Sequence, residues 1–163
     1  MPFSPDRNLK LSSIQHVVYE YANLMAAAYY SIHGQAPWRT HCDDAFLLGC
    51  RKLGDFLLNR KRYKKDVLAV DFLPSQTIRL NLPIWSDWRT AMDKQLAHIS
   101  FIRDKEWNHT KWVPLLEVEF NRAWWDFLDA ITDDEYRAEF IRQLDKCKNK
   151  PGFDNIILSR KQI

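Results

Sequence analysis

Apolar side chains recur at steps of three and four residues through most of this 163-residue chain. An α-helix completes a turn in about 3.6 residues, so this spacing gathers the apolar side chains on one face, which the fold must bury. The first stripe begins after Ser12 or Ser13, either of which can cap a helix, and ends at His33–Gly34. Its apolar members are Ile14, Val17, Val18, Tyr21, Leu24, Met25 and Ala28.

The same spacing predicts four further helices, over residues 41–60, 85–104, 111–130 and 132–148. Each begins near a residue that can cap a helix, and these are Thr40, Ser86, Thr110 and Thr132 in chain order. Residues 66–84 carry prolines near the middle and the end, and they predict a long connection with one short helical turn.

Five long helices joined by mostly short connections predict an all-α protein, an antiparallel helical bundle. The glycine content is low, at four residues, which favours helices over strands. No repeat or linker divides the chain, so we expect a single domain over residues 1–163, with residues 1–11 and 150–163 as irregular arms.

The composition excludes several classes of protein. The net charge of +3 comes from 24 basic and 21 acidic residues, so the chain as a whole is not a polycation that coats nucleic acid. Three cysteines without a CxxC motif are typical of reduced intracellular thiols. The sequence has no apolar run that could cross a bilayer and no signal-peptide core, so we expect a cytoplasmic protein without a membrane partner.

The best local candidate for a metal site is His41-Cys42-Asp43-Asp44. The remaining ligands that such a site needs are missing from the sequence pattern. The chain also has no glycine-rich phosphate loop and no GxSxG motif. We therefore expect no metal and no cofactor.

A basic cluster, Arg60-Lys61-Arg62-Tyr63-Lys64-Lys65, follows the second predicted helix. Cations are favoured at a helix C-terminus, so one interpretation is a solvated helix end. The other interpretation is a surface that faces phosphates, because an aromatic side chain lies among the cations.

The predicted helix over residues 85–104 holds the most suggestive polar cluster, Lys94, His98 and Arg103. On a helical wheel His98 lies at the border of the apolar face, with Lys94 one turn before it, whereas Arg103 points along that face. His98 and Arg103 can therefore cooperate only if the helix distorts or if a second chain supplies the partner. The apolar face consists of Trp85, Trp88, Met92, Leu96 and Ile99.

The segment Asp93-Lys94-Gln95-Leu96-Ala97-His98 resembles the R-D/N-K-x-x-A-H segment of HEPN domains. HEPN domains are small helical bundles that are common in bacterial toxin–antitoxin and abortive-infection systems. In active members an Arg and a nearby His carry out metal-independent RNA cleavage, usually where two subunits meet. Here Met92 stands in the place of the Arg, and Arg89 or Arg103 could replace it. Arg103 with His109 also fits the motif in a second register.

The resemblance implies a HEPN-like protein of a bacterial defence or stress system, an endoribonuclease that works as a homodimer. Imidazole suits proton transfer and guanidinium suits phosphate charge. The predicted catalytic residues are therefore His98, Arg103 and His109, and the predicted substrate-binding residues are Lys94, Arg89, Arg60 and Arg62. Because Met92 replaces the Arg, a second prediction stays open: a catalytically inactive bundle that binds RNA or a partner protein such as an antitoxin.

Overall fold

The computed structural model describes residues 5–35, 38–61, 63, 65–74, 80–97 and 109–150, and for Thr40, 91–97 and 109–110 the backbone alone. Within these residues the chain forms five α-helices, one 3-10 helix and no strand, which confirms the predicted all-α bundle. The helices are α1 (Arg7–His33), α2 (Trp38–Leu57), α3 (Pro83–Ala97), α4 (His109–Ala130) and α5 (Asp134–Lys146), and the 3-10 helix is η1 (Ala69–Asp71).

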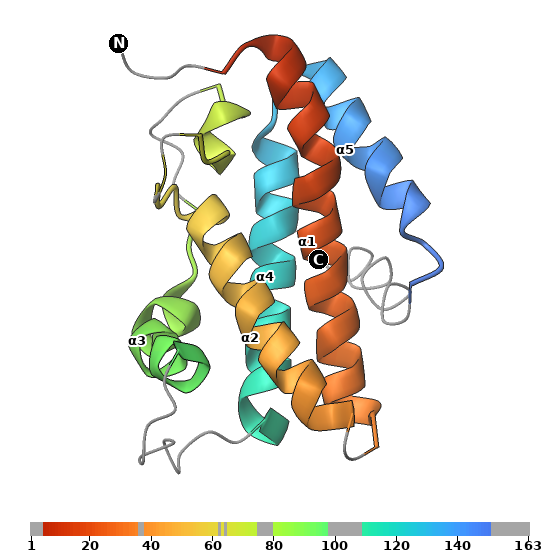
Figure 1. Ribbon diagram of the computed structural model, residues 1–163. Coiled ribbons are helices and arrows are strands. Elements are labelled where there is room, and N and C mark those ends of the chain that lie inside the picture. Colours follow the sequence, from red (N-terminus) through yellow and green to blue (C-terminus); the bar gives the residue numbers. More distant parts are fainter. Residues whose placement is uncertain are drawn as a thin grey trace.

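Helix α1 runs through the centre of the bundle (Figure 1), where it packs against α2, α4 and α5. Helices α2 and α4 run in the opposite direction to α1, as the colour gradient along each ribbon shows in Figure 1. Helix α3 lies on the outside and contacts α2 and α4. In the described part of the chain, no helix is at once long enough and apolar enough to cross a membrane.

The core is rich in aromatic rings, and one of them belongs to the long connection between α2 and α3. Phe72 directly follows η1 and is buried. Its ring lies edge-on to Phe140, with centroids 5.2 Å apart, and to Tyr136, with centroids 5.5 Å apart. Such edge-to-face pairs add about 0.5–1.5 kcal/mol each beyond the burial of their area. The connection is therefore anchored in the core at η1.

Helix α1 begins earlier than its sequence pattern predicts. Its cap is Asp6, whose carboxylate accepts a hydrogen bond of 2.8 Å from the amide of Leu9. The predicted caps, Ser12 and Ser13, lie inside the helix and donate their hydroxyls to carbonyls one turn earlier. The predicted cap is therefore wrong, and residues 7–11 of the predicted irregular arm are helical because a carboxylate upstream already caps the amides.

The starts of three other helices also differ from the predicted caps. Helix α2 begins at Trp38 and includes Thr40, and α4 begins at His109, one residue before the predicted cap. Helix α5 is capped by Asp133 rather than Thr132, because the Asp133 carboxylate accepts 3.1 Å hydrogen bonds from the amides two and three residues further on. These differences are small shifts along the chain and leave the packed faces unchanged.

Helix α3 is capped by a side chain from another helix. Glu119 of α4 is only 4% exposed, and its two carboxylate oxygens accept hydrogen bonds from the amides of Ile84, at 2.7 Å, and Trp85, at 2.8 Å. The predicted cap, Ser86, is exposed instead. A buried carboxylate satisfies two amides that a helix start leaves without partners. This contact fixes the start of α3 against α4.

Two tryptophans hold α3 against its neighbours. Trp85 is fully buried, and Gly54 of α2 leaves the space that its indole occupies. Trp88 is half-buried, and its ring contacts that of Trp112 in α4, with centroids 3.8 Å apart. Both residues belong to the predicted apolar face of α3; of its other members, Met92 and Leu96 are described by backbone alone and Ile99 lies outside the described residues.

Candidate nucleic-acid interface

The basic cluster of the sequence follows the end of α2, and we call residues 60–65 the basic connection. Arg60 is half-buried, whereas Lys61 and Lys65 are exposed. Tyr63 is 74% exposed. The other two cations of the basic connection, Arg62 and Lys64, lie outside the described residues.

The basic connection starts from a tightly closed helix end. Asn59 adopts a left-handed backbone conformation, with φ at 55°. The amide of Arg60 donates to the carbonyl of Asp55 at 2.8 Å, and the amide of Asn59 donates to the carbonyl of Phe56 at 3.2 Å. This pair of hydrogen bonds is a Schellman motif, which satisfies the last carbonyls of a helix and turns the chain away from its axis. The asparagine takes the position that glycine occupies most often.

Side chains fix the basic connection at two further points. The Asn59 amide oxygen accepts a 2.8 Å hydrogen bond from the backbone amide of Val70 in η1. The Asp66 carboxylate accepts a 2.7 Å hydrogen bond from the amide of Tyr63, and the amide of Asp66 donates to the Tyr63 carbonyl at 3.1 Å. The backbone of Tyr63 is therefore held in a turn while its ring stays exposed.

Two of the predicted substrate-binding arginines meet at Asp55. The guanidinium of Arg89 in α3 forms an ion pair with the Asp55 carboxylate, with 3.2 Å between Nη2 and Oδ1. Only 25% of the Arg89 side chain and 15% of the Asp55 side chain are exposed. Arg60 reaches the same residue through its backbone amide. Arg89 thus ties α3 to α2 through its guanidinium, whereas the contact of Arg60 with Asp55 is made by its backbone.

The remaining predicted site residues are described partly or not at all. His98, Arg103 and Arg62 lie outside the described residues. Lys94 belongs to α3 and His109 is the first residue of α4, but the structure describes their backbone alone. The predicted catalytic cluster therefore stays a prediction, whereas four of the six residues of the basic connection have described side chains.

Helices α3 and α4 are joined by the contact between Trp88, in the first half of α3, and Trp112, near the start of α4. The ammonium of Lys111 lies 4.6 Å from the centroid of the Trp112 ring, a cation–π distance. The sequence pattern indicates neither contact, because Trp112 lies outside the apolar stripe of its own helix.

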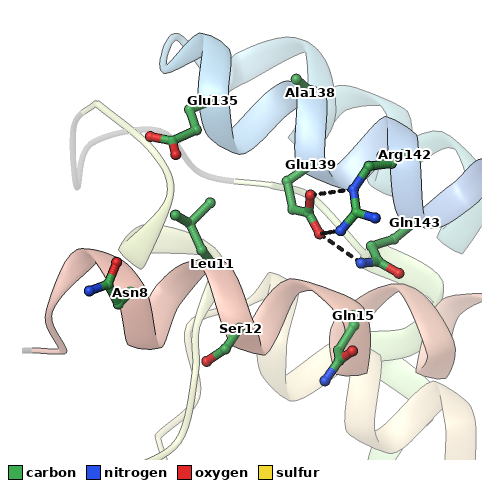
Figure 2. Close-up of a pocket in the computed structure, with 9 residues that line it drawn as sticks. All are labelled: Asn8, Leu11, Ser12, Gln15, Glu135, Ala138, Glu139, Arg142 and Gln143. Atoms are coloured by element: carbon green, nitrogen blue, oxygen red, sulfur yellow. Dashed lines mark hydrogen bonds and ion pairs between the residues drawn. The ribbon is translucent and has the colours of Figure 1, made fainter.

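A groove of about 620 Å³ lies between α1 and α5 (Figure 2). Its cation, Arg142, is bound by the carboxylate of Glu139 at 2.7 and 2.5 Å, and Gln143 donates to the same carboxylate at 2.6 Å. The hydrogen bond from Arg142 lowers the pKa of Glu139. Glu135 adds a second carboxylate to the lining. The described groove thus has its positive charge neutralised and is a poor site for a polyanion.

Desolvation raises the pKa of two titratable side chains, Tyr21 and Glu117. The hydroxyl of Tyr21 in α1 donates to the side chain of Asn121 in α4 at 2.7 Å, and burial raises the pKa of Tyr21 well above its usual value. Burial also raises the pKa of Glu117. In the residues with described side chains, no three or more His, Cys, Asp or Glu form a group that could hold a metal ion.

Comparisons of the chain with models of known protein families, with curated protein sequences and with solved structures give no match. The function must therefore be inferred from the chain itself. Among the described surfaces, the basic connection combines accessible positive charge with an exposed aromatic ring.

Proposed function

We propose that this protein binds single-stranded RNA through the basic connection. The observation that carries the proposal is the 74% exposure of Tyr63, on a fixed backbone turn, within a run of five cations. Sites for single strands combine cations that follow the phosphates with aromatic rings on which bases stack. Tyr63 would stack on a base, and Arg60, Lys61 and Lys65 would contact phosphates.

The alternative, a solvated helix end, accounts for the basic connection less well. Cations at a helix C-terminus interact with its last carbonyls, but the carbonyls of Asp55 and Phe56 already accept backbone hydrogen bonds. The side chains of Arg60, Lys61 and Lys65 have no ion-pair partner in the part of the chain that the structure describes. A solvated helix end also gives no reason for an exposed tyrosine.

The arrangement favours single strands over duplexes. A side-chain ring can stack on a base only where that base is unpaired and splayed out. The turn at Tyr63 is closed by Asp66 before any ligand arrives, so less conformational entropy is lost on binding. The net charge of the chain is only +3, so phosphate binding would be local to the basic connection.

The first test measures binding of a labelled single-stranded RNA by fluorescence anisotropy. Tyr63→Ala is expected to weaken binding by about 5- to 150-fold, the range for the loss of one stacked base, whereas Tyr63→Phe keeps the ring and most of the affinity. Replacing both Lys61 and Lys65 by Gln should flatten the slope of log K against log salt by about 1.4, since each phosphate contact to a single strand contributes about 0.7.

The matched control is Tyr19→Ala. Tyr19 is also exposed, at 55%, and lies 4.4 Å from the ammonium of Lys150, so it is an exposed tyrosine beside a cation away from the basic connection. Equal affinity of wild type, Tyr63→Ala and Tyr19→Ala, or a duplex bound as tightly as a single strand, would contradict the proposal.

RNA cleavage by His98, Arg103 and His109 is the second candidate function. The Trp88–Trp112 contact favours it, because it joins α3 to α4, and in the sequence His98 and Arg103 fall between these helices while His109 begins α4. A shared cleft of the HEPN type would require a homodimer. Histidine would move the protons of a metal-independent cleavage and Arg103 would stabilise the phosphate charge.

Cleavage is tested by incubating labelled tRNA with the protein in excess EDTA. We expect EDTA-resistant cleavage by the wild type that is lost in His98→Ala, Arg103→Ala or His109→Ala, and a dimer in sedimentation. Cleavage that is absent, or equal in all four proteins, would remove the enzyme and leave RNA binding as the function. A strict monomer would exclude the shared cleft.

A further inference from the structure

A small apolar cavity lies next to the basic connection, between α1 and α2. Its volume is about 200 Å³. Leu53 and Phe56 of α2 line it from the buried side, and half-buried Val17 of α1 and Val67 form its walls. Apolar cavities that open to solvent and carry a few polar groups are typical of ligand sites.

Polar side chains from both helices also line this first cavity. His16 and Lys52 are exposed, and the Lys52 ammonium forms a 2.9 Å ion pair with the carboxylate of Glu20. Imidazole can donate or accept a hydrogen bond, ammonium donates and carboxylate accepts. A ligand ring with polar edges that occupies this cavity would therefore meet both hydrogen-bond donors and acceptors.

A second cavity adjoins the first and leads to the basic connection. Its volume is about 220 Å³, and it shares Ser13 and Val67 with the first. Lys65 and Asp71 also line it. One oxygen of the Asp71 carboxylate accepts a 2.9 Å hydrogen bond from the amide of Leu68, and a carboxylate has the capacity to accept several more. A sugar hydroxyl is a donor that suits it.

The volume of the first cavity indicates which kind of base it can hold. An apolar cavity of about 150 Å³ accepts a benzene ring, so the first cavity has room for one six-membered ring with its substituents. The two-ring system of a purine would project beyond it. A cavity for one ring, a neighbouring acceptor for a hydroxyl and Lys65 for a phosphate match the base, the sugar and the phosphate of a nucleotide.

We propose that the two cavities hold one unpaired pyrimidine ribonucleotide of the RNA bound at the basic connection, an inference that rests on the proposed RNA binding. The base occupies the first cavity, between Val17 and Val67. The 2′-hydroxyl donates to Asp71 in the second cavity, and Lys65 contacts the phosphate. The protein thereby distinguishes pyrimidines from purines and RNA from DNA.

The experiment measures the affinity of the full chain for oligo(U), oligo(A) and oligo(dU) of equal length by anisotropy at one salt concentration. We expect oligo(U) to bind about tenfold more tightly than oligo(A), the scale on which an apolar pocket discriminates by size. We expect oligo(dU) to bind about tenfold more weakly than oligo(U), since it lacks one hydrogen bond to a charged acceptor.

Two variants locate the site. Val67→Phe fills the first cavity and should reduce the affinity for oligo(U) to that for oligo(A), leaving oligo(A) unchanged. Asp71→Ala should remove the preference for oligo(U) over oligo(dU), whereas Asp71→Asn, which keeps one acceptor oxygen, should only reduce it. Leu48→Phe, on the exposed face of α2, is the matched control and should change no affinity. If circular dichroism shows Val67→Phe to be unfolded, Val17→Met fills the same cavity from α1.

The outcomes separate this inference from the proposed function. Equal affinities for oligo(U) and oligo(A), or a cavity-filling variant that leaves the oligo(U) affinity unchanged, would overturn the inference while the effect of Tyr63→Ala on binding stands. Absence of binding to all three oligonucleotides would overturn both. Loss of oligo(U) affinity in Leu48→Phe as well would also overturn the assignment to the cavity.

Discussion

Replacing Glu119 by alanine is expected to lower the free energy of unfolding by about 3 kcal/mol, because one buried and one part-buried amide then lose their acceptor and each lost bond costs about 1–3 kcal/mol. The carboxylate itself is screened from water, since Glu119 is only 4% exposed. Urea denaturation followed by circular dichroism measures the change. Hydrogen exchange should further show that the amides of α3 lose protection first, because Glu119 is what fixes the start of that helix.

A conservative variant and a matched control test whether the lost cap causes the loss of stability. Glu119→Gln keeps one acceptor oxygen and should cost less than the alanine variant. Glu117→Ala removes a half-buried glutamate of the same helix that makes no such cap, and it should change the stability by less than about 1 kcal/mol. If Glu119→Ala and Glu117→Ala are equally stable, the cap contributes nothing and α3 is held by its tryptophans alone.

Gly54→Ala is expected to destabilise the fold by about 2 kcal/mol, although alanine forms helix better than glycine by about 1 kcal/mol. A Cβ at position 54 would lie 2.3 Å from Nε1 of Trp85 and 2.9 Å from its Cδ1. The Trp85 ring is fully buried, so it cannot move aside without displacing α3. Urea denaturation of the purified variant gives the magnitude.

Gly49→Ala is the matched control in the same helix. Its Cβ would lie 3.0 Å from Cδ1 and 3.3 Å from Cβ of Leu24, so a much smaller shift is needed than for the 2.3 Å approach at position 54. The gain in helix propensity should offset that contact, so we expect stability within about 1 kcal/mol of wild type. A Gly54→Ala protein as stable as Gly49→Ala would show that the α2–α3 interface tolerates a wider spacing.

The packed faces of the helices were predictable because they depend on local periodicity. Tyr21, Leu24 and Met25 are buried as the first stripe predicts. The helix starts were less predictable, since a cap depends on which acceptor reaches the amides first. Glu119 lies 35 residues from the amide of Ile84 in the sequence, and no local pattern connects the two.

The candidate site also combines a part that the local sequence predicts with parts that depend on tertiary contacts. The basic connection is visible in the sequence because its cations are contiguous. The adjoining cavities are not visible, because Val17, Leu53 and Val67 come from two helices and a connection that meet only in the fold. The pairing of Arg89 with Asp55 is likewise a tertiary contact, so the sequence offers no sign that this arginine is already bound by another residue.

The burial of Phe72 has a consequence for how the chain between α2 and α3 can vary. Ring contacts with Tyr136 and Phe140 fix this connection to the core near its middle. Closure entropy rises only slowly with the length of a flexible segment, and it is counted for each closed segment separately. The segment from Leu57 to Phe72 is therefore closed by its own contacts. Residues inserted after Phe72 would not loosen this segment, which carries Tyr63.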